Sequence, residues 1–400
     1  NDSLLAYDDF GGKFRPLPFD FSRASSATVV NKAGLIETVQ SGISRIDFKD
    51  DANGALLLEP QSTNLINYSE DFSNGSWANT GVGVVSGFTS PDGTDNAFKL
   101  VEDTSTGNHK INSLIATTSA GVNSFSIYVK KGELNKIGVK ESIATGKYAT
   151  FDLVNLTVLD VATGVGTSIK SMANGWVKIS ISVAVTGTSI RFSTHLLQNS
   201  YTSGDPNASH TGDGTSGVYI YGAQIEALSY PTSYIPTQGA ISTRLAESCS
   251  QTPPSGVIGQ TEGTVFLDSK MALQNINNFQ LFSINNGGSS DRIRVLTATA
   301  GRLRFIYQLN SGVSYSFYNP TDYSDLTSLK IAFTYKSGDI KVYINGVLVD
   351  SSTNTFTIAQ TLTNIDIATS AGGYNQMLFN DVQLYNTALT DAELISLTTI

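Results

Sequence analysis

Two tryptophans, Trp77 and Trp176, are the side chains of this sequence best suited to hold a sugar ring. The apolar C–H face of a sugar can stack on an indole, while amide and carboxylate groups bond its hydroxyls. Trp77 lies in a polar stretch, residues 73–79, which is typical of a loop, and Trp176 stands at the start of an alternating strand. Because large aromatic side chains dominate core burial, packing is the alternative for both, and the more frequent one.

Residues 197–217 form a long stretch without a strand pattern. A loop of this length in a compact domain is more often functional or interfacial than idle. Five of its side chains have the composition of a sugar site: Tyr201, Asp205, Asn207, His210 and Asp213. The alternatives are a solvated loop and a contact between the subunits of an oligomer.

The sequence carries no recognisable catalytic motif. It lacks both the Gly-x-Ser-x-Gly elbow and the Gly-x-x-x-x-Gly-Lys phosphate loop, and its three histidines offer little for acid–base catalysis. Its aspartates and glutamates are scattered along the sequence and form no recognisable catalytic pair. Glu262 and Asp268 flank Phe266 on a predicted strand, and we interpret them as part of a solvated face. We therefore predict that the protein is not an enzyme.

Composition and charge exclude further classes of partner and structure. The 400 residues are 15% charged and 10% aromatic, with a net charge of −9. Because 25 basic residues are scattered among 34 acidic ones, we expect no nucleic acid partner. No apolar run reaches the ~18 residues of a membrane helix, so no membrane insertion is expected. The single cysteine, Cys249, can form no internal disulfide. Because the sequence starts at Asn1 rather than Met, we expect a trimmed, processed or incompletely given chain.

The hydropathy pattern predicts β structure nearly throughout. Alternation of apolar and polar residues marks half-buried strands, and it occurs in residues 124–130, 176–183, 330–335 and 339–344. The one predicted helix lies at the C-terminus, where Thr390 and Glu393 form a capping box. We therefore predict an all-β fold with two jelly-roll or β-sandwich domains after an irregular N-terminal segment, and one short C-terminal helix.

Four segments are expected along the chain. The irregular start is too short for a core of its own, so we expect it to pack on a neighbour or on another copy. A polar stretch with the pair Pro253-Pro254 predicts a linker. The predicted boundaries are an attachment or packing segment at 1–63, a β-sandwich at 64–246, the linker at 247–256 and a second β-sandwich at 257–400.

Short motifs extend over most of residues 19–245: FDFSRASSAT (19–28), LLEPQSTNL (57–65), GDGTSGVYIYGAQIE (212–226) and YPTSYIPT (230–237). Together they resemble the N-terminal region of bacteriophage tail and head-fibre proteins. The middle part is also similar to jelly-roll carbohydrate-binding modules, which often clamp Ca²⁺ through oxygen ligands between the first and last strands. Glu70, Asp71 and Glu226 stand at roughly those positions. The resemblance therefore implies Ca²⁺ as a candidate cofactor.

Other motifs lie in the last predicted segment: GTVF (263–266), the hairpin from Lys330 to Asp350, and FNDVQLYNTALTDAEL (379–394). This part resembles laminin-G/concanavalin-A-like sandwiches. Leu329-Lys330 stand where that family usually has a Trp-His pair, so its ligand residues are not carried over. The Glu-x-Asp-x-x-Glu pattern of concanavalin-like glycosidases is absent from residues 257–400.

The resemblances imply a bacteriophage virion protein on the particle surface, either a fibre, a spike or a decoration. Such a protein would adhere to host-surface or extracellular polysaccharide without cleaving it. Its N-terminal segment would contact other virion proteins, and the fibre arrangement implies a homotrimer. Two alternatives remain. One is a purely structural decoration that binds only neighbouring virion proteins, and the other is the binding module of a secreted polysaccharide-degrading enzyme.

Overall fold

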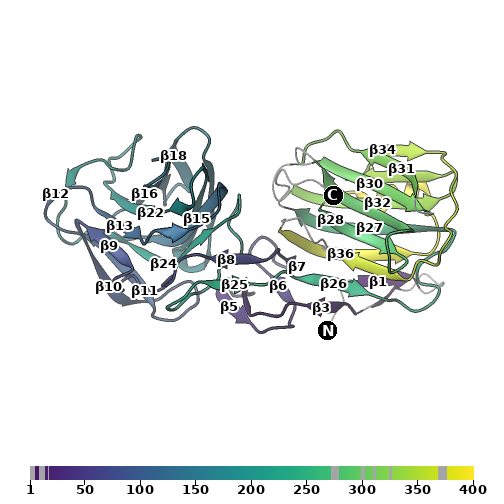
Figure 1. Ribbon diagram of the computed structural model, residues 1–400, viewed down its shortest axis with the longest axis horizontal. Coiled ribbons are helices and arrows are strands. Elements are labelled where there is room, and N and C mark those ends of the chain that lie inside the picture. The colour runs from purple at the N-terminus through teal and green to yellow at the C-terminus, as the bar shows by residue number, and fades with distance from the viewer. Residues whose placement is uncertain are drawn as a thin grey trace. The chain divides into compact units, whose positions relative to one another are not determined.

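The computed structural model describes residues 5–8, 14–16, 18–271, 279–298, 302–309, 312–323, 327–367 and 376–400. Their regular structure is almost entirely β strand, and the α-helix among them is α1 (Asp391–Thr398) (Figure 1). The all-β prediction is confirmed. The predicted capping box is also present: the Thr390 hydroxyl accepts from the Glu393 N–H, and the Glu393 carboxylate accepts from the Thr390 N–H. Within the described residues, no helix has the length and apolar character to cross a membrane.

The chain divides into two compact units whose boundaries differ from the predicted segments. The N-terminal unit consists of Ser25–Val39 and Ser62–Arg244. The C-terminal unit consists of Asn1–Ala24, Gln40–Gln61 and Leu245–Ile400. The segment predicted at 1–63 is therefore shared between both units, and its described parts pack within the chain.

Two antiparallel sheets form the body of the N-terminal unit. The first has the order β10 (Val82–Phe88), β11 (Ala97–Glu102), β24 (Gly217–Glu226), β15 (Gly121–Lys131), β20 (Val177–Val185) and β19 (Gly166–Ser171). The second has the order β18 (Thr157–Val161), β17 (Tyr148–Asp152), β16 (Lys136–Glu141), β22 (Phe192–Leu197), β13 (Lys110–Ser113) and β9 (Trp77–Thr80). The small ladders are β4 (Ala27–Val30) with β5 (Ile36–Val39), β8 (Ser62–Asn64) with β25 (Ser242–Arg244), β12 (Thr106–Gly107) with β23 (His210–Thr211), and β14 (Ala116–Thr117) with β21 (Ser189–Ile190).

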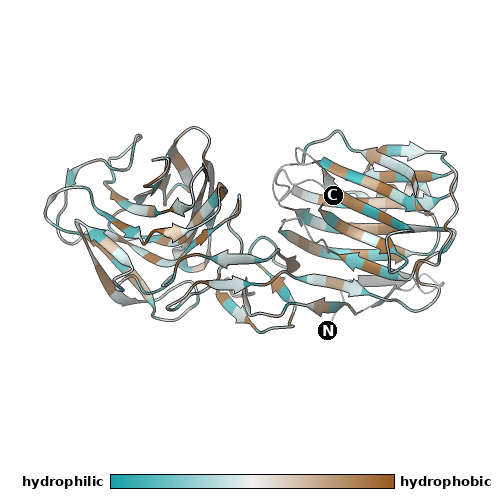
Figure 2. Cartoon of the chain, viewed as in Figure 1, coloured by the Kyte–Doolittle hydropathy of each residue, from teal (hydrophilic) through white to brown (hydrophobic). Residues whose placement is uncertain are grey.

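Alternating apolar side chains fill the space between these two sheets. Ile127 and Val129 of β15 belong with Ile137 and Val139 of β16 to one buried cluster. Figure 2 shows the resulting alternation of hydrophobic and hydrophilic residues along the strands. Since successive side chains of a strand point to opposite faces, the intervening residues lie on the outer faces of the sandwich.

The C-terminal unit is a second sandwich. Its first sheet has the order β2 (Phe14–Pro16), β1 (Leu5–Asp8), β36 (Met377–Tyr385), β27 (Glu262–Met271), β32 (Thr327–Lys336), β33 (Ile340–Ile344) and β34 (Val347–Ser352), while β7 (Ala55–Leu58) pairs with β36 and with β6 (Arg45–Asp47). Its second sheet has the order β3 (Asp20–Ser22), β26 (Ser248–Gln251), β35 (Asn364–Ile367), β28 (Gln280–Asn285), β29 (Arg292–Ala298), β30 (Arg302–Leu309) and β31 (Gly312–Tyr318). Helix α1 packs Leu394 against Phe266, Ala332 and Tyr343 of the first sheet.

A strand stands where the linker was predicted at 247–256. In β26, Cys249 pairs with Phe21 of β3 and with Ile367 of β35, and it is 1% exposed. Burial raises the pKa of its thiol to about 12. This single apolar position in a polar stretch is a core position of the C-terminal unit, because the neighbouring serines face away from the core.

Candidate functional site

The outer face of the second sheet in the C-terminal unit is polar across four neighbouring strands. Phe282 and Ile284 of β28 and Ile293 and Val295 of β29 lie in the core, so the residues between them point outward. Strand pairing places polar outward side chains in two rows, Asn364–Asn285–Arg292–Gln308 across all four strands and Asp366–Ser283–Arg294 across three, the second row ending against the buried Ile306 of β30. We call these seven residues the polar face.

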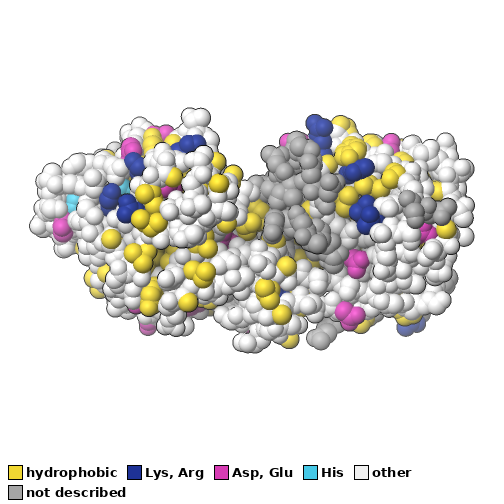
Figure 3. Space-filling view, viewed as in Figure 1, with side chains coloured by type: hydrophobic (Ala, Val, Ile, Leu, Met, Phe, Trp, Pro, Cys, Tyr) yellow, Lys and Arg dark blue, Asp and Glu magenta, His cyan; other side chains and the backbone are white. Residues whose placement is uncertain are grey.

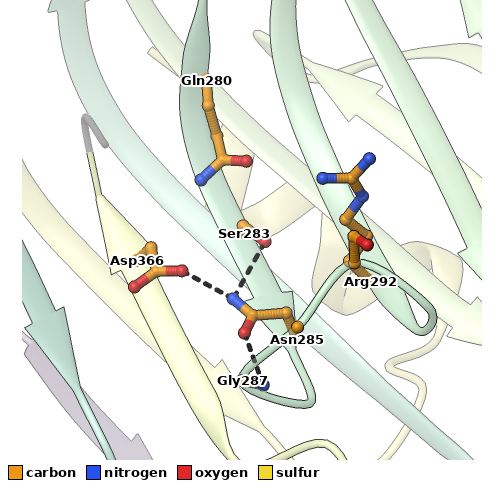
Figure 4. A pocket seen from close by; sticks show the side chains of 8 residues that line it. Gln280, Ser283, Asn285, Gly287, Arg292 and Asp366 are labelled. Carbon is orange, nitrogen blue, oxygen red and sulfur yellow. Dashed lines mark hydrogen bonds between the residues drawn. The ribbon is translucent and has the colours of Figure 1, made fainter. Parts of the chain in front are cut away.

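A pocket of about 420 Å³ opens at the β35–β28 side of the polar face (Figure 4). It is lined by Gln280, Ser283, Asn285, Gly287, Gly288, Ser289, Arg292 and Asp366. The buried amide of Asn285 lies at its centre. Its Nδ2 donates to Asp366 Oδ2 at 2.6 Å and to Ser283 Oγ at 3.3 Å, and its Oδ1 accepts from the Gly287 N–H at 2.8 Å. Gly287 has a φ of 79°, which favours glycine. The pocket is thus held rigidly by hydrogen bonds.

Burial shifts the pKa values of the charged side chains around this pocket. Burial raises the pKa of Asp366, against the opposing effect of the Asn285 hydrogen bond. Burial also lowers the pKa of Arg292. For Arg294, burial together with repulsion from Arg292 and Arg304 lowers the pKa to about 10, and no carboxylate contributes. Because Arg292 and Arg294 stand against the single carboxylate of Asp366, the polar face carries a net positive charge, although the whole chain is acidic.

An aromatic ring extends this surface onto β31. Tyr318 is 54% exposed and pairs with Arg304, whose guanidinium carbon lies 4.5 Å from the ring centroid. Arg304 is held in turn by Ser316, whose Oγ accepts from Arg304 Nε at 3.2 Å. Figure 3 shows basic side chains among hydrophobic ones on the visible face of this unit. An exposed aromatic next to arginines and amides supplies both kinds of contact that sugar recognition uses.

The region that holds this polar face can be compared with known proteins. Residues 269–395 match the family model Laminin_G_3, described as the concanavalin A-like lectin/glucanases superfamily. This region is similar to concanavalin A-like domains, and we call it the concanavalin A-like region. The predicted resemblance of the last segment is confirmed, and both rows of the polar face lie inside the match. No curated protein matches the sequence.

Solved structures are similar to part of the chain. A native heptameric SAP-like pentraxin from Limulus polyphemus is 17% identical over 34% of this chain and 70% of its own, with a TM-score of 0.29. The Ruminococcus gnavus IT-sialidase CBM40 bound to alpha2,3 sialyllactose is 19% identical over 35% of this chain and 84% of its own, with a TM-score of 0.29. The binding domain of botulinum neurotoxin serotype D is 16% identical over 38% of this chain and 40% of its own, with a TM-score of 0.32.

The two tryptophans singled out in the sequence lie outside the concanavalin A-like region, in the N-terminal unit, and both are buried. Trp77 is 6% exposed, packs against Phe72 at a centroid distance of 4.7 Å, and donates from Nε1 to the Tyr68 carbonyl at 2.9 Å. Trp176 is 1% exposed and clusters with Ile36 of β5. Neither indole presents a face to a sugar, which agrees with the packing alternative for both.

Three of the five predicted loop residues contact a row of lysines on the second sheet of the N-terminal unit. The Tyr201 carbonyl accepts from Lys136 Nζ at 2.5 Å, Asp205 pairs with Lys140 at 2.5 Å, and Asn207 Oδ1 accepts from Lys110 Nζ at 3.3 Å. The stretch 198–207 therefore packs against the outer face of that sheet. The side chains of Asp205 and Asn207 are engaged by the sheet, and the Tyr201 hydroxyl donates to the Gly204 carbonyl within the loop.

The other two loop residues point elsewhere. Asp213 closes its own turn, where hydrogen bonds from Ser216 and Thr215 hold the pKa of its carboxyl well below the usual range. His210 Nε2 lies 2.9 Å from Glu102 Oε2 and stacks on a second histidine, His109. Tyr201, Asp205 and Asn207 thus lie over the lysines of the sheet, whereas His210 and the Asp213 N–H both contact Glu102.

The predicted calcium ligands are engaged by protein donors. Glu70 accepts from the Tyr221 and Tyr234 hydroxyls at 3.0 and 3.1 Å, and burial raises its pKa. Asp71 accepts from the N–H and hydroxyl of Ser73. Glu226 is fully buried and accepts from Ser62, Gln224 and Thr232. These three carboxylates do not form a cluster of ligand atoms among the described residues, and calcium on them stays a prediction.

Sequence reasoning missed the polar face because its members are spread over four strands. Each strand shows only a local signal, in which polar residues alternate with core residues, as in Phe282-Ser283-Ile284-Asn285 and Ile365-Asp366-Ile367. Such a pattern is ordinary for a half-solvated strand. Only the pairing register brings the amides, Asp366 and the arginines side by side.

Proposed function

We propose that this chain binds glycans without cleaving them, and that the polar face of the concanavalin A-like region is the binding surface. The observation that carries the proposal is the rigid Asn285–Asp366 pocket beside Arg292 and Arg294 on one outer sheet face. Amide, carboxylate and hydroxyl groups in one pocket suit a ligand with many hydroxyls, because each hydroxyl both donates and accepts.

The charge of the polar face favours a glycan that carries carboxylates. A guanidinium binds a carboxylate through two parallel hydrogen bonds, and partial burial strengthens that contact. Arg292 and Arg294 are paired to Asn285 and Ser283 across the strands rather than to acids. A uronate or sialate group would complete this arrangement, and Tyr318 lies on the same face as a stacking surface.

The lining of the pocket supports binding rather than cleavage. Glycosidases place two carboxyl groups on either side of the scissile bond, roughly 5–9.5 Å apart, and the pocket lining contains one, Asp366. Asp268 and Asp381 are paired across β27 and β36 on the other sheet, and burial raises the pKa of both. This pair is the observation that favours a hydrolase as the second candidate function.

The setting that we propose for this activity is the surface of a bacteriophage virion, in a homotrimeric fibre or decoration. This part of the proposal is supported by the resemblance of residues 19–245 to phage tail and head-fibre proteins. A fibre makes weak single contacts useful, because linked sites multiply the apparent affinity. Light scattering on a sizing column tests the trimer directly: a particle of three 42.6 kDa chains is expected, and a monomer would contradict it.

The experiment for glycan binding is a microarray of defined oligosaccharides, followed by calorimetry on the best ligand. Expected ligands contain uronate or sialate, and their neutral counterparts should bind more weakly. Asp366→Asn and Arg292→Gln should each weaken binding by about 10-fold or more, since a hydrogen bond to a charged group contributes about 1.5–3 kcal/mol. Lys170→Gln, an exposed residue of the N-terminal unit, is the control for the change in net charge.

The outcomes separate the competing functions. Binding that survives both pocket variants would move the site away from the polar face. Failure of every glycan to bind, with retained binding to virion partners, would support the purely structural alternative. Release of reducing ends from a bound polymer by the parent protein, and its loss in Asp268→Asn or Asp381→Asn, would show a hydrolase and contradict the non-catalytic proposal.

A further inference from the structure

Two histidines and a glutamate from separate parts of the sequence meet in the N-terminal unit. Glu102 ends β11, His109 directly precedes β13, and His210 begins β23. One potential ligand atom from each lies within 4.8 Å of the others. The two imidazole rings stack with centroids 4.3 Å apart and an interplanar angle of 29°. The strands therefore bring three metal-ligand side chains to one point.

His109 is the unusual member of this group. Its ring is 1% exposed, and neither ring nitrogen has a hydrogen-bond partner among the described residues. Nε2 lies 3.4 Å from the Asp103 carboxylate, an ion-pair distance rather than a hydrogen bond. Buried polar atoms without partners are rare because they lose solvation and gain nothing in return. Apart from the Asp103 carboxylate near Nε2, the described residues offer the His109 nitrogens no partner, which points to a ligand that the protein itself does not supply.

Close packing fixes the His109 ring in place. A Cβ on Gly212 would lie 2.9 Å from His109 Nε2 and 2.0 Å from the Asp103 carbonyl oxygen. A Cβ on Gly81 would lie 3.1 Å from His109 Cδ2. Glycine at both positions lets the backbone approach the ring from both chain segments. The backbone at Gly81 and Gly212 thus restricts the His109 ring to its position beside Glu102 and His210.

Glu102 supplies the negative charge of the group. It is 2% exposed, and its Oε2 accepts from His210 Nε2 at 2.9 Å and from Gln198 Nε2 at 3.1 Å. Its Oε1 accepts from the Asp213 N–H at 3.1 Å. Such outer hydrogen bonds orient a metal-ligating carboxylate. A divalent ion would replace the His210–Glu102 hydrogen bond, with release of the shared proton, and would leave the bonds from Gln198 and from the Asp213 N–H in place.

We propose that Glu102, His109 and His210 form a binding site for a zinc-class divalent ion. Two imidazoles and one carboxylate are the ligand set that Zn²⁺ takes in many proteins, with a water in the fourth position. Ligands 2.0–2.1 Å from zinc lie roughly 3.4 Å from one another, so small side-chain rotations bring the three atoms to that spacing. Ca²⁺ and Mg²⁺ prefer oxygen ligands and do not suit a site with two nitrogens.

The site would fasten the long loop of the N-terminal unit to the sandwich. His210 belongs to the two-residue ladder of β23 with β12, while Glu102 and His109 belong to the chain around β11 and β13. An ion bound to all three side chains would link these segments. Because a ligand that binds only the folded state stabilises that state, the ion would stabilise the folded N-terminal unit. This stabilising effect does not depend on the glycan surface in the other unit.

The test is calorimetric titration of the full, chelator-treated protein with zinc chloride alone. One zinc per chain is expected, together with a rise in Tm when zinc is present. His210→Gln keeps a donor for Glu102, and it should weaken zinc binding by more than the roughly 10–100-fold that loss of an outer-shell partner costs. His109→Gln should do the same. His195→Gln is the matched control, since His195 is the third and last histidine of the sequence.

Each outcome decides the proposal. Loss of zinc binding in His210→Gln but not in His195→Gln supports the site. If His109→Gln fails to fold, His210→Gln still decides, because the His210 side chain is 15% exposed and tolerates exchange more readily. The proposal is overturned if the parent protein takes up no zinc, or if both His109→Gln and His210→Gln bind zinc as the parent does. It is also overturned if calcium chloride competes with zinc at similar concentration.

Discussion

Arg45 and Glu247 form a bidentate ion pair in the interior of the C-terminal unit, although they lie 202 positions apart in the sequence. Arg45 Nε donates to Glu247 Oε1 at 2.8 Å, and a second guanidinium nitrogen donates to Oε2. Glu59 accepts from the same guanidinium at 2.9 Å, and Arg23 pairs with Glu247 at 2.6 Å. All four side chains are fully buried, so the two positive and two negative charges compensate one another away from water.

Replacing Arg45 by Met is therefore expected to destabilise the C-terminal unit. The variant leaves Glu59 and Glu247 buried with one cation, and breaking a buried pair from one side costs about 3–5 kcal/mol. Urea unfolding monitored by tyrosine fluorescence measures this loss. Arg302→Met, at an exposed position of β30, makes the same change of side chain and should shift the unfolding free energy by less than about 0.5 kcal/mol. Equal effects of the two variants would show that the buried pair contributes nothing specific.

This charge cluster illustrates what sequence patterns can and cannot reveal about the fold. Alternation in residues 124–130 and 330–335 predicts β15 and β32, because each strand reports its own two faces locally. Arg23, Arg45 and Glu247 carry no local signal of burial, since charged residues in polar stretches usually face water. Their pairing depends on contacts between distant segments. For this reason the N-terminal segment was predicted as a separate part, whereas its residues complete both units.

The surroundings of the predicted site residues also depend on distant segments. Trp176 directly precedes β20 and lies in one buried cluster with Ile36 of β5, Tyr128 and Tyr221. Its burial thus involves side chains from distant segments, which a local pattern does not show. The unusual loop was recognised by its length, but the pattern cannot show that lysines of the adjacent sheet bind its polar groups.

Gly138 of β16 is expected to determine how closely the loop 198–207 packs against the second sheet of the N-terminal unit. A Cβ at this position would lie 2.3 Å from Cβ of Pro206, so Gly138→Ala must push the loop outward. Overpacking of this kind costs about 1–3 kcal/mol. Limited proteolysis should then cut within residues 198–207 several times faster than in the parent. Gly75→Ala, where a Cβ meets nothing within 4 Å, should leave the rate unchanged, and equal cleavage of both variants would rule out the contact.

Stability at acid pH is expected to depend on His195. Burial, with repulsion from Lys110 and Lys140 against attraction to Asp205, lowers its pKa to about 3. In the unfolded chain the pKa returns to about 6.5, so between these values the unfolded state binds the proton and the folded state does not. The contribution of His195 is complete above pH 6.5 and falls with pH by about 1.4 kcal/mol per unit.

His195→Gln removes this titration while keeping an amide near Ser193, to which the His195 ring bonds at 2.7 Å. Between pH 7 and pH 4.5 the parent should lose about 2–3 kcal/mol more unfolding free energy than the variant. Urea titrations at the two pH values measure both losses. Parallel pH dependence of parent and variant would show that His195 is protonated in the folded protein.

Arg294 is expected to serve binding at the expense of stability. Its guanidinium is half-buried beside Arg292 and Arg304, and Nε has no hydrogen-bond partner among the described residues. Arg294→Gln removes both the repulsion and the unpaired donor, so the free energy of unfolding should stay equal or rise. The affinity for a uronate-containing glycan should fall by about 10-fold or more, because the charge-assisted bond is lost. Calorimetry and urea unfolding on the same preparation measure both effects. A variant that is less stable and binds as well as the parent would show that Arg294 holds the sheet together, and the acidic group of the ligand would then have to be sought at Arg292.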